Sequence, residues 1–429
     1  MRLRALLREA NMTAGHLSRA VNQAGGEVDL ALHYDRTSVS HWLSGTRPPE
    51  PVPSLVAEVL SRALGRQVTA ADTGLLNGNA PVATRQSDDL GLSLVRLARP
   101  PTKELADSSV YTTLLELDAA EGNFAVPLAP SVPHAREAEP TSVPATELML
   151  PVFARIDMAF GGGAARQALS SYLAVDITPR LVLRMPPGRR DRFLRTASRL
   201  TYLAGYMHFD DNMNGIGQSY YQTAVRMAAA SADLRTYTTV LRAMSIQALH
   251  LGHRSLALDI AEAAARHNTD LPPGQAVLLT SQWALTLAAN GQRRKAFAEL
   301  RRAEQTFARG PLSTGTIDDF HAAAFAHQSA ETFAYAGEPA RAIRELTSSL
   351  RQRPADERRA RALINARLGG LQLDQGHLEQ ACAAWHLFLD DQAHLRSGRI
   401  ASALAEMRSR LRPFRQQPVA REVLNRSHS

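Results

Sequence analysis

Turn-forming residues recur at a nearly constant interval through the C-terminal part of the chain. Beginning at Asn212, they follow at Gly252, Gly291, Gly337 and Gly376, in steps of 40, 39, 46 and 39 residues. Gly, and less often Asn, adopts the left-handed backbone conformation at which helices commonly end. An interval of this length is typical of helix pairs that must stack on one another to bury their apolar faces. The pattern therefore predicts an α-solenoid over residues 152–415.

Small side chains flank these turns at the positions where two antiparallel helices would touch. They include Gly205, Gly217, Ala257, Ala261, Ala296, Ala342, Gly369 and Ala381. In this respect the five segments resemble tetratricopeptide repeats, whose standard unit has 34 residues. The longer interval predicts helices that are longer by roughly one turn. An irregular helical bundle is the alternative interpretation.

The first 78 residues read as a run of short helices. The third of these extends from about Asp35 or Thr37 to Ser44 and buries Val39, Trp42 and Leu43, which are spaced for one helical face. Gly45 and the prolines after it end the helix. The outward side chains are small, polar or basic, and such a face suits a helix that lies in the major groove of DNA.

This segment resembles the recognition helix and following turn of XRE-type, lambda-repressor-like helix-turn-helix proteins, with Ser40, Trp42, Gly45, Arg47 and Pro48 in the family pattern. The resemblance implies binding to double-stranded DNA. We expect eight residues to contact it: Thr13, His16, Arg36, Thr37, Ser38, Ser40, His41 and Arg47. Residues 25–34 form a ten-residue insertion between the second and third helices. A helical domain used only for docking is the alternative.

Residues 153–229 resemble the central segment of actinobacterial regulators that join such a domain to tetratricopeptide repeats, the NsdA-like group. The similarity depends on the run at residues 200–225 and on Gly161, Gly162, Ala165, Arg166, Leu169 and Tyr172. It implies a transcriptional regulator of differentiation or secondary metabolism whose repeats sense a ligand.

Residues 79–151 differ in composition from both flanking regions. They are rich in proline, and residues 81–150 carry ten acidic side chains against five basic ones. This predicts an acidic, partly ordered linker. The whole chain has a formal charge of +8, supplied almost entirely by arginine. Residues 416–429 are expected to form a disordered tail.

Candidate catalytic and metal-binding groups have simpler structural interpretations. No Gly-Lys-Ser/Thr follows Gly161, so the glycine run is not a phosphate loop. His250 and His253 could bind a metal, but no third ligand has suitable spacing. His208 and Asp210 lie where a helix should end, and polar helix ends need no catalytic explanation. We therefore expect no enzymatic activity, no metal and no cofactor.

Taken together, the sequence predicts an all-α protein with an N-terminal helix-turn-helix domain and a C-terminal tetratricopeptide-like solenoid. It should be a cytoplasmic, sequence-specific transcriptional regulator that forms a homodimer and contacts no membrane. The solenoid should bind a peptide or small-molecule effector through Tyr202, Tyr206, Arg242, Ser281, His327 and Glu331. The alternative is a repeat scaffold that binds proteins and no DNA.

Overall fold

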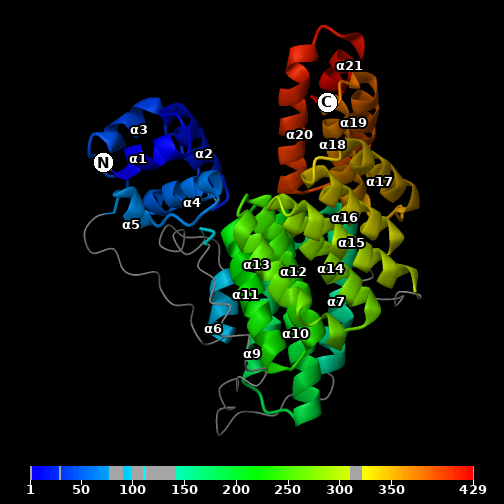
Figure 1. Cartoon of the computed structure of the whole chain (residues 1–429). Coiled ribbons are helices and arrows are strands. Elements are labelled where there is room, and N and C mark those ends of the chain that lie inside the picture. The colour runs from blue at the N-terminus through cyan, green and yellow to red at the C-terminus, as the bar shows by residue number, and fades with distance from the viewer. Residues whose placement is uncertain are drawn as a thin grey trace. The chain divides into compact units, whose positions relative to one another are not determined.

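The computed structural model describes residues 2–28, 30–76, 90–98, 110–112, 142–309 and 321–428. Within these ranges the regular elements are helices (Figure 1), which confirms the all-α prediction. None of the described helices is long and apolar enough to cross a membrane.

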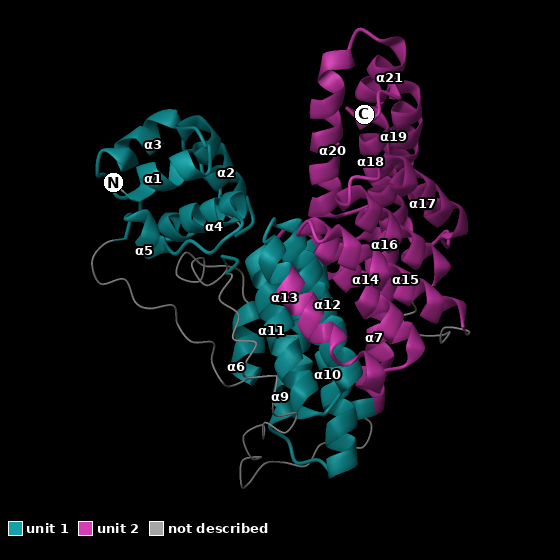
Figure 2. Cartoon of the chain, in the orientation of Figure 1, with its two compact units in different colours: residues 1–143, 168–209, 213–257 teal, residues 144–167, 210–212, 258–429 magenta. Residues whose placement is uncertain are grey.

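The chain divides into two compact units (Figure 2). One unit comprises residues 1–143, 168–209 and 213–257, and the other comprises residues 144–167, 210–212 and 258–429.

Five helices at the N-terminus surround a small apolar core that includes Leu17, Val39, Val56 and Leu60. The predicted third helix is confirmed as α3, which starts after Asp35 and ends before Ser44. The five helices are α1 (Arg2–Glu9), α2 (Ala14–Gly26), α3 (Arg36–Leu43), α4 (Val52–Leu64) and α5 (Ala70–Thr73).

Four further helices precede the repeats. Most of the predicted linker lies outside the described residues, but α6 and the start of α7 fall within its bounds. The four are α6 (Leu90–Ala98), α7 (Ser142–Phe160), α8 (Arg166–Tyr172) and α9 (Thr178–Leu181).

The repeat region consists of five consecutive helix pairs, each joined at one of the predicted turns. All five turn residues have positive φ, from 61° at Asn212 to 90° at Gly252, so the reasoning from turn chemistry is confirmed. The pairs are α10 (Pro187–Asp210) with α11 (Asn214–Ala230), α12 (Leu234–His250) with α13 (Arg254–Ala265), α14 (Pro273–Ala289) with α15 (Arg293–Ala308), α16 (Ala322–Tyr335) with α17 (Pro339–Gln352), and α18 (Arg358–Asp374) with α19 (Leu378–Gln392).

Glycines let the paired helices approach closely, as the small-residue pattern predicted. A Cβ atom added at Gly205 would lie 2.7 Å from the Tyr221 ring, and one added at Gly369 would lie 2.6 Å from the Trp385 indole nitrogen. Larger side chains at these two positions would push the helices of the first and fifth pairs apart.

The chain ends in ordered helices, so the prediction of a disordered tail is wrong. α20 (Gly398–Leu411) is followed by α21 (Pro418–Arg426), and the buried Ala420 and Val423 pack in the same apolar core as Trp385 and Leu411. Two apolar side chains one turn apart, after a proline suited to the first helical turn, are the local signal for this helix.

Candidate nucleic-acid interface

α3 is fixed at its start by a side-chain cap and along its inner side by an aromatic contact. The Asp35 carboxylate accepts a hydrogen bond from the Ser38 backbone N–H at 2.8 Å, and the Ser38 hydroxyl accepts one from the Asp35 N–H at 3.3 Å. This capping box starts the helix. The bonds from the backbone and hydroxyl of Ser38 hold the pKa of Asp35 below its ordinary value. On the buried side, Trp42 packs edge-on against Tyr34, with 5.0 Å between ring centroids.

The amide side chain of Asn22 helps to fasten the predicted insertion between α2 and α3 to α2. Asn22 donates from Nδ2 to the Tyr34 carbonyl and accepts from the Tyr34 N–H, both at 2.8 Å. The loop also folds against Gly25, where an added Cβ would lie 2.6 Å from Leu32. Because Tyr34 directly precedes the N-cap of α3, these contacts fix where α3 begins relative to α2. Sequence reasoning missed the role of Asn22.

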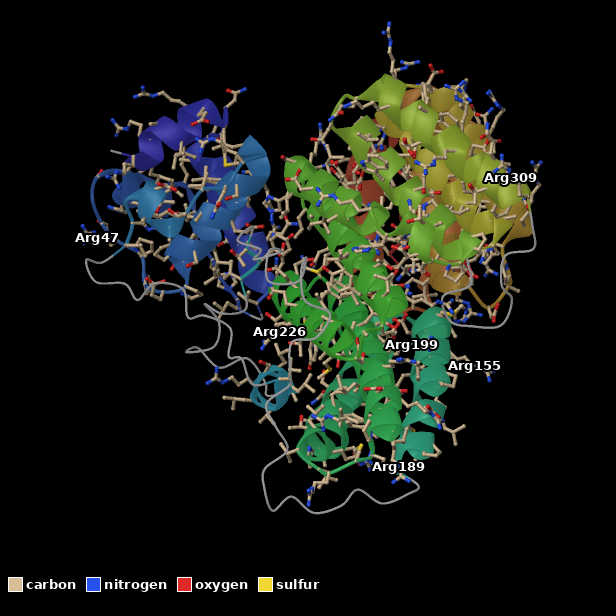
Figure 3. All side chains as sticks on the ribbon, turned by 60° about the horizontal axis from the view of Figure 1, so that its bottom comes forward. Arg47, Arg155, Arg189, Arg199, Arg226 and Arg309 are labelled. Carbon is tan, nitrogen blue, oxygen red and sulfur yellow. The ribbon has the colours of Figure 1, made fainter. Side chains whose placement is uncertain are left out.

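The exposed side chains of α3 lie on one face. Arg36, Thr37, Ser40 and His41 are exposed, and their spacing places them on adjoining turns of the same side. Arg47 is also exposed, in the loop after the helix (Figure 3).

Three of the four hydroxyl groups among the predicted contacts, those of Thr13, Ser38 and Ser40, are engaged within the protein. Ser38 is half-buried because it closes the capping box, and the Ser40 hydroxyl donates to the Arg36 carbonyl at 3.1 Å. The Thr13 hydroxyl caps α2 by accepting a hydrogen bond from the backbone N–H of His16, whose side chain is exposed. A hydroxyl that donates to its own helix can still accept a hydrogen bond. Arg36, His41 and Arg47 are the groups of this face that can carry positive charge.

Most acidic side chains of the N-terminal helices are neutralised or engaged away from this face. Glu9 pairs with Arg66 on the surface, and the Asp72 carboxylate closes the capping box of α5. Glu27 and Glu58 both pair with Arg62. Asp35, at the start of α3, is engaged as the N-cap.

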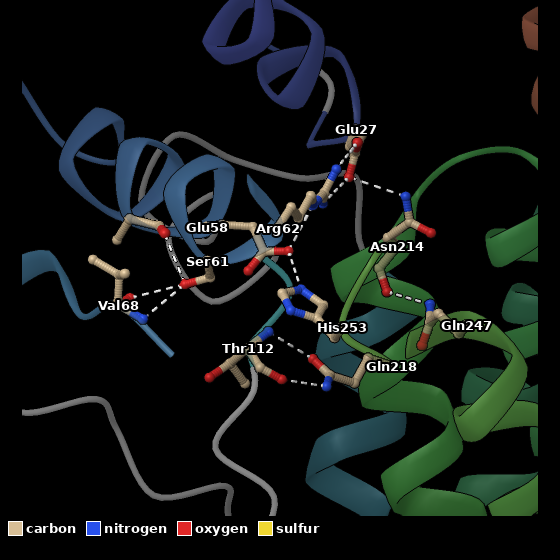
Figure 4. Close-up of polar contacts among 11 residues, drawn as sticks. Glu27, Glu58, Ser61, Arg62, Val68, Thr112, Asn214, Gln218, Gln247 and His253 are labelled. Atoms are coloured by element: carbon tan, nitrogen blue, oxygen red, sulfur yellow. Dashed lines mark hydrogen bonds and ion pairs between the residues drawn. The ribbon is translucent and has the colours of Figure 1, made fainter. Parts of the chain in front are cut away.

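A buried ionic cluster joins α4 to Asn214 of α11 and to His253, which precedes α13, within the first compact unit (Figure 4). Glu58 Oε1 lies 2.7 Å from Arg62 Nε and 3.0 Å from His253 Nε2. Arg62 also donates two hydrogen bonds to Glu27, at 2.7 and 2.8 Å, and Asn214 donates to Glu27 at 3.0 Å. The side chains of Glu58 and His253 are only 5% and 2% exposed.

The surroundings of this cluster favour charged arginine. Burial alone would lower the pKa of Arg62, but Glu27 and Glu58 outweigh burial and raise it above the ordinary value. Tyr111 stacks on the His253 ring at 5.3 Å, and burial raises the pKa of the Tyr111 hydroxyl. His253, considered above as a possible metal ligand, is thus a partner of a glutamate. The described residues contain no group of three side chains suited to hold a metal ion.

The polar residues at the end of α10 also have structural partners. His208 Nδ1 lies 2.7 Å from the Ala204 carbonyl oxygen. Asp210 accepts from the Gly162 N–H at 2.9 Å, and Asp211 accepts from Arg166 at 3.0 Å. Through these contacts the three side chains stabilise the end of α10 and hold the neighbouring loop.

Asp210 belongs to a second buried ionic cluster, which lies wholly within the second compact unit. Arg359 donates to Asp157 at 2.5 Å and lies 3.7 Å from Asp210. Burial raises the pKa of Asp157, and the charge of Arg359 opposes that shift only in part.

The six predicted effector-binding residues fall into two groups. Tyr202, Tyr206 and Arg242 are half-buried residues of the first compact unit, and the two tyrosine rings lie 6.5 Å apart. His327 and Glu331 are half-buried on α16 in the second unit, where Glu331 accepts from Arg367.

The sixth, Ser281, was expected to contact the effector, and that prediction is wrong. Its side chain is fully buried and its hydroxyl donates to the Val277 carbonyl at 2.6 Å. The hydroxyl is engaged inside its own helix, where a ligand cannot reach it.

Comparison with known proteins matches one family model, described as the SP15 N-terminal domain, to residues 3–76. The match covers α1–α5, the helices that carry the α3 face. No curated protein and no solved structure matches the chain.

Proposed function

We propose that the protein is a sequence-specific DNA-binding transcriptional regulator. The observation that carries the proposal is the exposed face of α3. It combines cationic and hydrogen-bonding side chains on adjoining turns of a helix whose other side is anchored in a core. Arginine, imidazole and hydroxyl groups at such spacing suit base edges and phosphates in the major groove.

In this proposal, residues of the face divide into two roles. Arg47, in the loop beyond α3, and His16 and Thr13, at the start of α2, contact phosphates and set the position of the domain. Thr37, Ser40 and His41 lie along the helix and read base edges, with Arg36 at its first turn. The helix is supported by the Asn22 bonds and the capping box, so its direction is fixed before DNA is met.

In this proposal the repeats join two chains into a homodimer and regulate its binding to DNA. A helical head of this size buries limited surface on DNA, so a homodimer that reads two half-sites is the expected arrangement. An effector bound to the repeats would change the spacing of the two heads. The buried cluster of Glu58, Arg62 and His253 provides a physical connection from α4 to the residue that precedes α13 within the first unit.

That same connection favours a second candidate function, in which the N-terminal helices only complete a scaffold that binds protein partners. Selection of duplexes from a random library, followed by salt titration, separates the two. A DNA-binding regulator should enrich a defined sequence and lose affinity steeply as salt rises, because neutralised phosphates release counterions. Enrichment of no sequence, with at most uniform weak binding, would support the scaffold.

A further inference from the structure

The outward side of α15 carries positive charge and no negative charge. The residues that follow one another along it, at spacings of three and four, are Arg294, Ala298, Arg301, Gln305 and Arg309, all of them exposed. Lys295, beside the first of these, is exposed as well. Solvated helix faces ordinarily mix both signs of charge, so this stripe is unusual. From its first arginine to its last it is about 22 Å long.

α17 lies beside α15 within the second compact unit. The Arg341 guanidinium of α17 lies 5.8 Å from the centre of the Phe297 ring of α15. The inner sides of the two helices also share one apolar core, to which α15 contributes Leu300 and α17 contributes Leu346. Because both helices turn their apolar sides to the same core, their opposite sides face solvent together.

The outer side of α17 is basic too. Arg344 and Arg351 are exposed, two turns apart, on the side opposite the buried residues of the helix. The second helix of the next pair, α19, differs, since it exposes Glu379, Leu387 and Asp390. The positive charge is therefore a property of α15 and α17 and not of every outer helix. We call this surface the basic face (Arg294, Lys295, Arg301, Arg309, Arg344 and Arg351).

The cations of the basic face keep donors for a partner. Within the described part of the chain, none of the six forms an ion pair. Arg301 donates from Nε to the Phe297 carbonyl at 3.3 Å, which leaves its other guanidinium nitrogens for a different acceptor. Arg294 and Lys295 lie in the first turn of α15, where the helix dipole disfavours positive charge. The stability of the helix therefore does not account for these two side chains.

The carboxylates nearest the basic face lie at its margins. Glu299 of α15 is 3.7 Å from Arg302, with which it pairs. Glu304 of α15 is close enough to Glu345 of α17 to affect it: burial, and then the charge of Glu304, raise the pKa of Glu345. Glu304 and Glu345 therefore belong to the junction between the two helices, and the outer sides keep a positive potential.

We infer that the basic face binds the phosphate backbone of duplex DNA without regard to sequence. A duplex carries one negative charge per about 1.7 Å of its axis, so a stretch as long as the α15 stripe presents roughly a dozen. Each guanidinium can pair with a phosphate through two hydrogen bonds. Such contacts position a protein on DNA but read no bases. The inference deepens the proposed function: it rests on DNA as the partner, but not on α3 as the reader of sequence.

Other anionic partners fit the basic face less well. Along the described helices α15 and α17, no large apolar or aromatic side chain is exposed. An amphipathic helix needs such side chains to enter a membrane surface, and protein partners are usually held by them. A nucleotide normally requires a concave site that buries most of its area, whereas these cations lie on the outer sides of two helices.

Fluorescence anisotropy of a fluorescein-labelled duplex of random sequence, titrated with the full-length protein over a salt series, tests the inference. The logarithm of the affinity changes with the logarithm of the salt concentration by about 0.9 for each phosphate contact. Arg294→Gln with Arg301→Gln should therefore reduce this slope by about two and weaken binding roughly tenfold or more at low salt. Arg294→Lys with Arg301→Lys keeps both charges and should keep the slope.

A matched control removes the same amount of charge elsewhere. Arg155→Gln with Arg421→Gln replaces two exposed arginines outside the basic face and should change neither affinity nor slope. Vesicles that contain phosphatidylserine and a polyglutamate peptide are the comparison probes. Unchanged affinity and slope in the Arg294, Arg301 glutamine variant, an equal loss in the control, or tighter binding of vesicles or polyglutamate than of duplex would overturn the inference.

This inference and the proposed function can fail separately. The Arg294, Arg301 glutamine variant should lose affinity for a selected duplex and for a random one by the same factor, so that its preference between them is unchanged. Ser40→Ala with His41→Ala should lose the preference and keep the salt slope. If no sequence is preferred but the glutamine variant still weakens uniform binding, the basic face is supported and sequence reading by α3 is not.

Discussion

Replacing Arg62 with methionine should destabilise α4 far more than the same replacement at Arg66, which follows α4 by two residues. Both arginines form hydrogen bonds with glutamate. Arg62 donates two to Glu27 and one to Glu58, and Arg66 donates to both carboxylate oxygens of Glu9. The surroundings differ. The carboxylates that face Arg62 are 12% and 5% exposed, whereas both partners of the Arg66 pair are about half exposed.

The expected magnitudes follow from what each change leaves behind. Without Arg62, two largely buried carboxylates share one site, and loss of one partner of a buried ion pair costs about 3–5 kcal/mol. Arg62 is itself 21% exposed, so the lower end, about 3 kcal/mol, is the appropriate expectation. An exposed pair such as Glu9 with Arg66 contributes about 0–1 kcal/mol.

Hydrogen–deuterium exchange measured on peptides of α4 tests this prediction, because exchange of protected amides reports the free energy of local opening. A loss of 3 kcal/mol should speed exchange roughly 150-fold in Arg62→Met and less than tenfold in Arg66→Met. Adding Glu58→Gln to Arg62→Met should restore much of the protection, because it removes one of the stranded charges. Equal, small effects of the two single variants would refute the reasoning.

Three other predictions concern the repeats and the assembly. In urea denaturation, Gly205→Ala should lower the free energy of unfolding by about 1–3 kcal/mol because the added Cβ would meet Tyr221. Gly188→Ala, at an open position of the same helix, should stabilise the protein slightly. Arg359→Leu should cost about 3–5 kcal/mol near pH 7 and regain stability as pH falls. A carboxyl whose pKa is raised by folding, such as Asp157, stabilises the protein at low pH and loses that contribution as pH rises through its folded pKa. If the cluster were solvated, the melting temperature of the variant would not rise as pH falls. Light scattering should give twice the monomer mass of 46.7 kDa, and a single monomeric peak would rule out the dimer.

Features that depend on neighbouring residues in the chain could be predicted from the sequence. The five repeat turns were found because Gly and Asn tolerate positive φ, a property of the single residue. The end of α3 was predicted from Gly45 and the prolines after it, and Asp35 was one of the two starts that its sequence allowed. Gly205 and Gly369 were assigned to close helix contacts because small side chains recur beside each turn.

Contacts between distant residues could not be predicted. His253 and Glu58 are 195 positions apart, and nothing in either local pattern indicates that they meet. The histidine therefore appeared to be one of a pair beside a turn. Ser281 was assigned to effector binding from its repeat position, although a serine inside a helix can bond to its own backbone and be fully buried.

The central claim, that the outer face of α3 reads DNA, is tested most directly by one comparison of affinities. A duplex selected by the native protein and a scrambled duplex are each titrated, by fluorescence anisotropy, with the native protein and with the Ser40→Ala, His41→Ala variant. The two changed side chains are exposed, so the domain should remain folded. We predict that the native protein prefers the selected duplex and that the variant loses most of this preference while keeping its salt-dependent binding to both. Unchanged affinity and unchanged preference in the variant would contradict the account.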